Sequence, residues 1–134
     1  MNKKRINNYI PIAERAIIEL KIADSNRKVS KNYRSHISSF GAAITLGSLK
    51  AATAFFLTQG DSDVERPVLL RAIYYIITDN HENLPKDKVT KILDFVCNTN
   101  DEIALREAFI DASIALKLAL NAFDLGKKKD GERQ

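Results

Sequence analysis

Apolar residues recur at steps of three and four along most of the chain, which is the spacing of one face of an α-helix. Over residues 11–27 this spacing predicts a first helix, whose inner face carries Ile10, Ala13, Ala16, Ile17, Leu20 and Ala23. Pro11 suits the first turn because its missing N–H has no intrahelical partner there. At about 100° per residue, Ile18 and Ile22 fall on the opposite face. We therefore predict a second packing surface at Ile18 and Ile22, within the domain or as an interface with another subunit.

A second helix is predicted after Ser30, which can cap it, and its apolar positions are Tyr33, Ile37, Phe40 and Ile44. Glycine lowers helix propensity by about 1 kcal/mol relative to alanine. The glycines of this segment, Gly41 and Gly47, therefore favour a kink or break near Gly47. Residues 48–59 are apolar nearly all round, which predicts a third helix at the centre of a bundle.

Three further helices are predicted between polar connectors. One opens at residues 65–67, one opens at Pro85, and a long last helix is capped by Asp101 and runs to Phe123, with Gly126 as its stop signal. We find no convincing strand. The fold class is therefore all-α, a compact single-domain bundle of about five to six helices over residues 1–126, followed by a flexible basic tail over residues 127–134.

Composition agrees with one folded domain, because 45% of the 134 residues are hydrophobic and 28% are charged. The single cysteine, Cys97, excludes an intrachain disulfide and is interpreted as a small buried apolar residue. The N-terminus lacks the apolar core of a secretory leader, and the most apolar stretch, residues 51–57, is far shorter than the ~20 residues of a membrane span. We expect a cytoplasmic protein with no membrane contact.

Residues that could support catalysis are scarce. The two histidines are His36 and His81, and no Cys-x-x-Cys pair, His-Glu-x-x-His helix or glycine-rich phosphate loop is present. His81 lies among acids and amides in a segment that is interpreted as a polar loop. We therefore expect no enzymatic activity, no metal, no cofactor and no small-molecule substrate.

Charge is distributed unevenly along the chain. Residues 1–50 hold ten Lys and Arg against three acids, a net +7, whereas residues 51–134 hold eleven against fourteen, a net −3. The densest cluster comprises Arg27, Lys28, Lys31 and Arg34, with Lys50 nearby in sequence, and no acid lies between Asp24 and Lys50. Such a cluster can contact several phosphates or can simply be solvated. Tyr33 within it is interpreted as a core aromatic or as a stacking face for a base.

Two segments resemble a known family. Residues 32–40 begin with a Tyr-Arg-Ser helix start, and residues 46–57 contain a glycine break followed by Leu-x-x-Ala-x-Ala-Phe. This order is similar to the small-subunit family of the type III-B CRISPR effector, the Cmr complex. The acid-opened last helix, from Asp101 through an Ala- and Leu-rich stretch to Phe123, also resembles that family's final helix.

The resemblance implies a non-catalytic subunit of an antiviral ribonucleoprotein. Several copies would stack beside other effector subunits and support the backbones of guide RNA and target RNA. The RNA-facing side would carry Arg27, Lys28, Lys31, Arg34 and Lys50.

Alternative hypotheses are the small subunit of the type III-A effector, and a helical protein–protein adaptor that makes no nucleic-acid contact. The adaptor would dock through Ile18 and Ile22 or through the last helix. A helix-turn-helix regulator with its turn near Gly47 is disfavoured, because the helix that follows is too apolar for a major groove.

Overall fold

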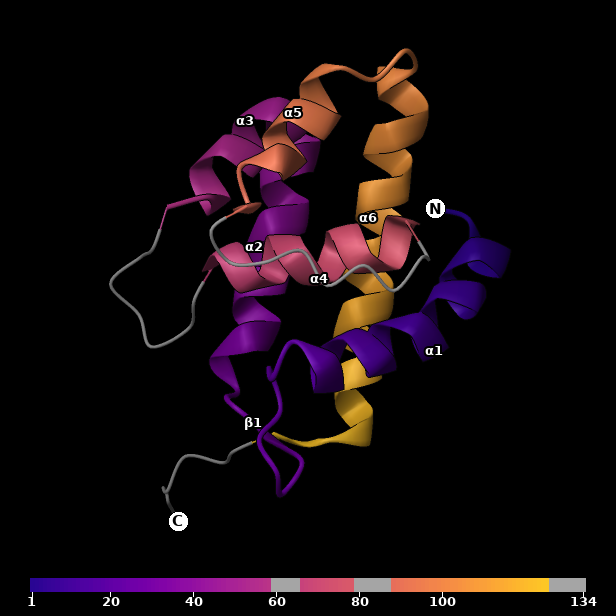
Figure 1. Ribbon diagram of the computed structural model, residues 1–134. Helices are drawn as coiled ribbons and strands as arrows, with labels where there is room; N and C mark the ends of the chain where they lie inside the picture. The colour runs from indigo at the N-terminus through magenta and orange to yellow at the C-terminus, as the bar shows by residue number, and fades with distance from the viewer. Residues whose placement is uncertain (59–65, 79–87, 126–134) are drawn as a thin grey trace.

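The computed structural model describes residues 1–58, 66–78 and 88–125. Within these ranges the chain is helical apart from loops and one very small sheet, so the predicted all-α fold is confirmed (Figure 1). The predicted tail at residues 127–134 and His81 lie outside the described residues. The helices are α1 (Lys3–Glu19), α2 (Asn32–Leu46), α3 (Leu49–Phe56), α4 (Arg66–Thr78), α5 (Lys91–Cys97) and α6 (Glu102–Ala119), which a 3₁₀ turn, Leu120–Ala122, extends.

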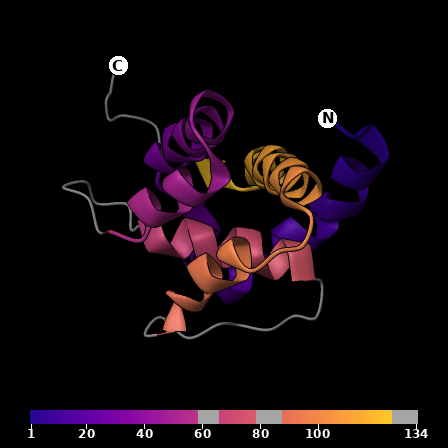
Figure 2. The same cartoon turned by 90° about the horizontal axis from the view of Figure 1, so that it is seen from above.

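Helix α6 forms the axis of the bundle. It packs against α1, α2 and α4, and Figure 2 shows it lying between α1 and α2. Its inner face is fully buried at Phe109 and Leu116. The ring of Phe109 lies 6.4 Å from that of Phe40 on α2, which in turn lies 5.0 Å from Phe56 on α3. These aromatic contacts join the three helices in one core.

The start of α1 differs from the prediction. The helix begins at Lys3, where the side chain of Asn2 caps it by accepting the N–H of Arg5 at 3.0 Å, so Pro11 lies inside the helix. It ends at Glu19, and Lys21 takes a left-handed backbone with φ of 60°. The predicted extension to residue 27 is therefore wrong, because the chain reverses into a loop.

A buried ion pair ties the first turn of α1 to the middle of α6. Arg5 Nε donates to Asp111 Oδ2 at 2.9 Å, and Arg5 Nη2 forms an ion pair with the same oxygen at 2.8 Å. The Asp111 side chain is 1% exposed and that of Arg5 is 31% exposed. The backbone N–H of Asn2 adds a longer bond of 3.4 Å to Asp111 Oδ1. The chain's first turn is thus anchored by a carboxylate that the solvent does not reach.

The predicted break at Gly47 is confirmed, since Gly47 caps the C-terminus of α2 and Ser48 caps α3 by accepting the N–H of Ala51 at 3.0 Å. The predicted central position of the third helix is wrong. Helix α3 buries one face and leaves Ala51, Ala54 and Phe55 exposed. An exposed alanine leaves only a small apolar area in water, and the ring of Phe55, 58% exposed, is partly covered by the guanidinium of Arg66 at 4.6 Å.

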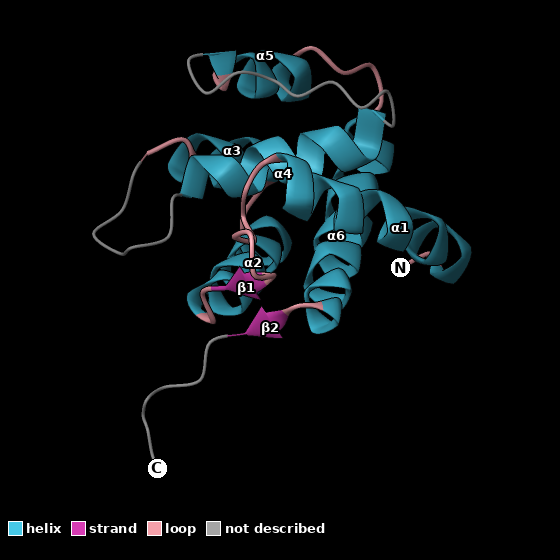
Figure 3. Cartoon of the chain, turned by 60° about the horizontal axis from the view of Figure 1, so that its bottom comes forward, coloured by secondary structure: helices cyan, strands magenta, loops and turns pink. Residues whose placement is uncertain are grey.

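Two short strands were not predicted. Strand β1 (Lys28–Val29) pairs in parallel with β2 (Asp124–Leu125), with Lys28 opposite Asp124 and Val29 opposite Leu125. Figure 3 shows this pair at the end of the bundle where α2 begins and α6 ends. Val29 is buried, so the pairing fastens the loop after α1 to the end of α6.

Candidate nucleic-acid interface

Four of the five predicted RNA-binding residues lie at one end of the bundle. Arg27 precedes β1, Lys28 belongs to it, Lys31 stands at the N-terminus of α2, and Arg34 lies in the first turn of that helix. We call these four residues the basic corner. Arg27, Lys28 and Lys31 are exposed and Arg34 is half-buried. The structure therefore brings the cluster together at the surface, as the sequence predicts.

A tight loop built on Asp24 sets the backbone of the corner. The Asp24 carboxylate accepts the N–H of Asn26 at 2.8 Å and that of Lys28 at 3.0 Å. These two hydrogen bonds hold the pKa of Asp24 below its ordinary value, and the bond from the Lys28 N–H has the larger effect. Within this loop Arg27 adopts a left-handed backbone with φ of 62°, a conformation that non-glycine residues seldom take. The loop thus fixes the backbone positions from which the side chains of Arg27 and Lys28 extend.

Both arginines reach the C-terminal end of α6. Arg27 Nη2 donates to the carbonyl of Ala122 at 3.1 Å, and its guanidinium lies 4.3 Å from the centre of the Phe123 ring. Arg34 Nη1 donates to Asn121 Oδ1 at 2.6 Å. Cations are favoured at this negative end of the helix dipole. Because a guanidinium has five N–H donors, these bonds position each arginine and leave further donors for a phosphate.

Two carboxylates share the corner. Asp24 lies in its loop, and Asp124 lies opposite Lys28 in the strand pair. Four cations against two carboxylates give these six residues a net charge of +2. The corner therefore attracts a polyanion, although less strongly than a count of its lysines and arginines alone would indicate.

Lys50 does not join the corner, and its predicted place in the cluster is wrong. It lies in the first turn of α3, beyond the far end of α2. Fifteen residues of helix span about 22 Å at 1.5 Å per residue. The length of α2 therefore places Lys50 at the opposite end of the bundle although it is close in sequence, as Figure 1 shows for α3 and β1.

The two predicted interface residues differ in solvent exposure. Ile18 is 52% exposed on α1, as a docking residue requires, but Ile22 is 6% exposed and belongs to the core. The prediction for Ile22 is wrong because α1 ends before it, so the 100° rotation used to place it no longer applies. Tyr33 packs against the core, which favours the core interpretation of this aromatic. Cys97, predicted to be buried, is exposed at the end of α5.

Sequence reasoning missed the partners of the two arginines, which lie in the 3₁₀ turn after α6, and the lysine beside them. Lys117 lies one turn before Asn121 and donates to Ser38 Oγ at 2.6 Å, while Ser38 lies one turn after Arg34. The two bonds, Arg34 to Asn121 and Lys117 to Ser38, form successive rungs between α2 and α6. Only the i, i+4 spacing on each helix signalled this arrangement.

Among the described residues, no group of three or more His, Cys, Asp or Glu side chains is placed to hold a metal ion. None of the described helices combines the length and the apolar character that a membrane crossing requires. No protein-family model, curated protein or solved structure matches the chain.

Proposed function

We propose that the chain is a non-catalytic small subunit of a type III-B CRISPR (Cmr) effector, and that it supports guide and target RNA by contacting their phosphates with the basic corner. The observation that carries the RNA contact is the convergence of Arg27, Lys28, Lys31 and Arg34 at one exposed end of the bundle. The resemblance of residues 32–57 to that family supports the assignment to this effector.

The arginines and the lysines of the basic corner differ in how they can contact RNA. Arg27 and Arg34 are bonded to the end of α6, so they have fixed positions and spare donors. Lys28 and Lys31 are exposed point charges on either side of Val29 and Ser30. Contacts from such groups to phosphates position an RNA strand without reading its bases. Binding is therefore indifferent to sequence and weakens as salt rises.

The partners of this subunit are further copies of itself and other effector subunits in the cytoplasm. Ile18 is the exposed apolar residue on α1 that is available for such a contact. Of the two alternative assignments, the type III-A small subunit and an adaptor that does not touch RNA, only the adaptor makes a different prediction in the experiment below. The type III-A subunit binds RNA in the same way and is distinguished by the effector subunits that co-purify with it.

The test measures fluorescence anisotropy of a labelled uridine homopolymer of about 20 nucleotides at several salt concentrations. Four phosphate contacts on a single strand predict a slope of log K against log salt of about −3. Neutralising two contacts in the double variant Lys28→Gln/Lys31→Gln reduces the slope to about −1.5. A mixed-sequence RNA of equal length is expected to bind equally well.

The matched control is Lys88→Gln/Lys91→Gln, which removes the same charge from exposed lysines at and just before α5, at the other end of the bundle. It is expected to keep the wild-type slope, and Lys50→Gln is expected to keep it too. If both double variants lower the slope equally, binding follows net charge and the basic corner is not the site. Absence of binding by the wild type at any salt concentration favours the adaptor.

A further inference from the structure

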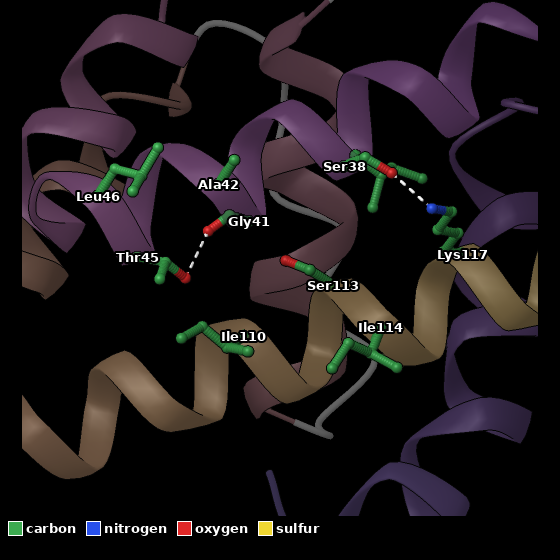
Figure 4. A pocket seen from close by; sticks show the side chains of 10 residues that line it. Ser38, Gly41, Ala42, Thr45, Leu46, Ile110, Ser113, Ile114 and Lys117 are labelled. Carbon is green, nitrogen blue, oxygen red and sulfur yellow. Dashed lines mark hydrogen bonds between the residues drawn. The ribbon is translucent and has the colours of Figure 1, made fainter.

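An apolar groove runs between α2 and α6, beside the basic corner. Its volume is about 490 Å³, and its walls carry aliphatic and small side chains from both helices. Figure 4 shows Ile110 and Ile114 of α6 facing Gly41, Ala42 and Thr45 of α2 across the opening. We call this feature the α2–α6 groove.

The depth of the groove comes from Gly41. This glycine lies in the interior of α2, where glycine is a poor helix former. A Cβ built on it meets no other atom within 4 Å, so packing among the described residues does not require a glycine there. The missing side chain therefore leaves room for something outside those residues.

The polar groups of the walls define the chemistry of an occupant. Thr45 Oγ1 donates to the carbonyl of Gly41 at 3.0 Å, and Ser113 Oγ donates to that of Phe109 at 2.8 Å, so both hydroxyl protons are used within the chain. Lys117 is the one ionisable residue of the lining, and no carboxylate belongs to it. The groove thus suits an apolar body with an anionic group at the Lys117 end.

The dimensions favour a helix of another protein. From Ser38 to Thr45 the groove follows eight residues of α2, a rise of about 10 Å, which equals two turns of a docked helix. Leu46, 87% exposed, extends the apolar wall at the end opposite Lys117. The groove is open to solvent, whereas a small ligand is normally buried over most of its surface. A partner that brings its own fold can cover what the groove leaves open.

We propose that the α2–α6 groove receives an amphipathic helix of a partner protein. Apolar side chains of that helix at positions i, i+3 or i+4, and i+7 fill the space above Gly41, and an Asp or Glu one turn further pairs with Lys117. This proposal does not depend on RNA binding, since the groove contains none of the four residues of the basic corner.

The test uses the full chain and a designed helical peptide with leucines at i, i+3, i+4 and i+7 and a glutamate at i+11. A second peptide with lysine at i+11 is the matched control. Wild-type protein is expected to bind the glutamate peptide about fivefold more tightly, the worth of a partly exposed ion pair. In Lys117→Glu this preference reverses.

The variant Gly41→Leu fills the groove and is expected to weaken binding of the glutamate peptide by about tenfold or more. Ala54→Leu adds the same side chain on an exposed face of α3 and is expected to bind like the wild type. Gly41→Ala, which favours the helix and adds one methyl group, shows whether substitution at this site leaves the fold intact. Thermal melts of each variant establish that the rest of the protein is intact.

Four results overturn the proposal. One is equal peptide affinity of Gly41→Leu and the wild type, and another is equal affinity for the two peptides. The third is concentration-dependent self-association that Gly41→Leu abolishes, because the occupant is then a second copy of this chain. Absence of saturable binding of either peptide up to about 1 mM, the weakest affinity that a specific contact would have here, also overturns it.

Discussion

Removing either partner of the Arg5–Asp111 pair destabilises the fold, and the two losses should be unequal. The Asp111 side chain is 1% exposed and the Arg5 side chain is 31% exposed. In Arg5→Met the carboxylate stays buried, and its nearest remaining donor is the Asn2 N–H at 3.4 Å. An uncompensated buried charge costs about 3–5 kcal/mol.

In Asp111→Asn the shape of the side chain is nearly unchanged and the guanidinium is left without its carboxylate. Because Arg5 lies at the edge of the interface, water can solvate it again. The loss is then that of the charge-assisted hydrogen bonds, about 1–2 kcal/mol. The expected difference between the two variants is about 2 kcal/mol, with Arg5→Met the less stable.

Urea unfolding followed by circular dichroism measures this difference. With an m value of about 2 kcal/mol/M, the midpoints of the two variants should differ by about 1 M. Lys4→Met, on the exposed residue beside Arg5, is the control and should shift stability by less than about 0.5 kcal/mol. The double variant Arg5→Met/Asp111→Leu replaces the pair by apolar groups and should recover most of the loss. Equal midpoints for the two single variants would refute the argument from unequal burial.

Two further predictions concern single side chains. Thr53 is fully buried on α3, and its Oγ1 has no hydrogen-bond partner among the described residues, so Thr53→Val should raise the free energy of unfolding by about 1 kcal/mol. A clear loss of stability in urea unfolding would show that the hydroxyl is satisfied. Because folding lowers the pKa of Asp24, its carboxylate stabilises the fold at pH values above the ordinary pKa of 3.8. This contribution is lost as the pH falls through the lower folded-state pKa. Asp24→Asn keeps the acceptor oxygen, so its urea midpoint should fall less steeply with pH than that of the wild type below about pH 4; parallel profiles would contradict this.

Local rules were sufficient for much of the helical architecture. The break at Gly47 and the cap at Asp101, whose Oδ1 accepts the N–H of Ala104 at 3.1 Å, follow from residue type and position within a few residues. These features depend on neighbours in sequence, so the sequence alone predicts them.

The limits of α1 were misjudged because one local rule overrode the periodic pattern. The rule for proline predicts a first-turn position for Pro11, although Ile6 and Ile10 continue the same apolar stripe toward the N-terminus, and Ile6 is buried. At the other end the stripe ran on past Glu19 into residues that are buried in a loop. Burial of Ile22 therefore reflects the reversal of the chain, which a helical projection cannot represent.

The basic corner was predictable as a cluster but not as a structure. The four cations lie within eight residues of sequence, and their common surface follows from that closeness. Their anchors at residues 121–124 lie more than eighty residues away, and neither two-residue strand shows a periodic pattern. For Lys50 the argument from closeness in sequence fails, because the helix α2 separates it from the basic corner.

The difference between the arginines and the lysines of the corner determines how its charge is presented. Arg27 bonds the Ala122 carbonyl and lies against the Phe123 ring, and Arg34 bonds Asn121, so both side chains fasten the loop and α2 to the end of α6. Such bonds use the planar, multidonor guanidinium, which a lysine cannot replace. Lys28 and Lys31 are carried on the backbone that these arginines hold, within reach of solvent. The end of α6 therefore supports the backbone that carries both lysines, and we expect a change at Asn121 to weaken the proposed RNA contact without removing a lysine.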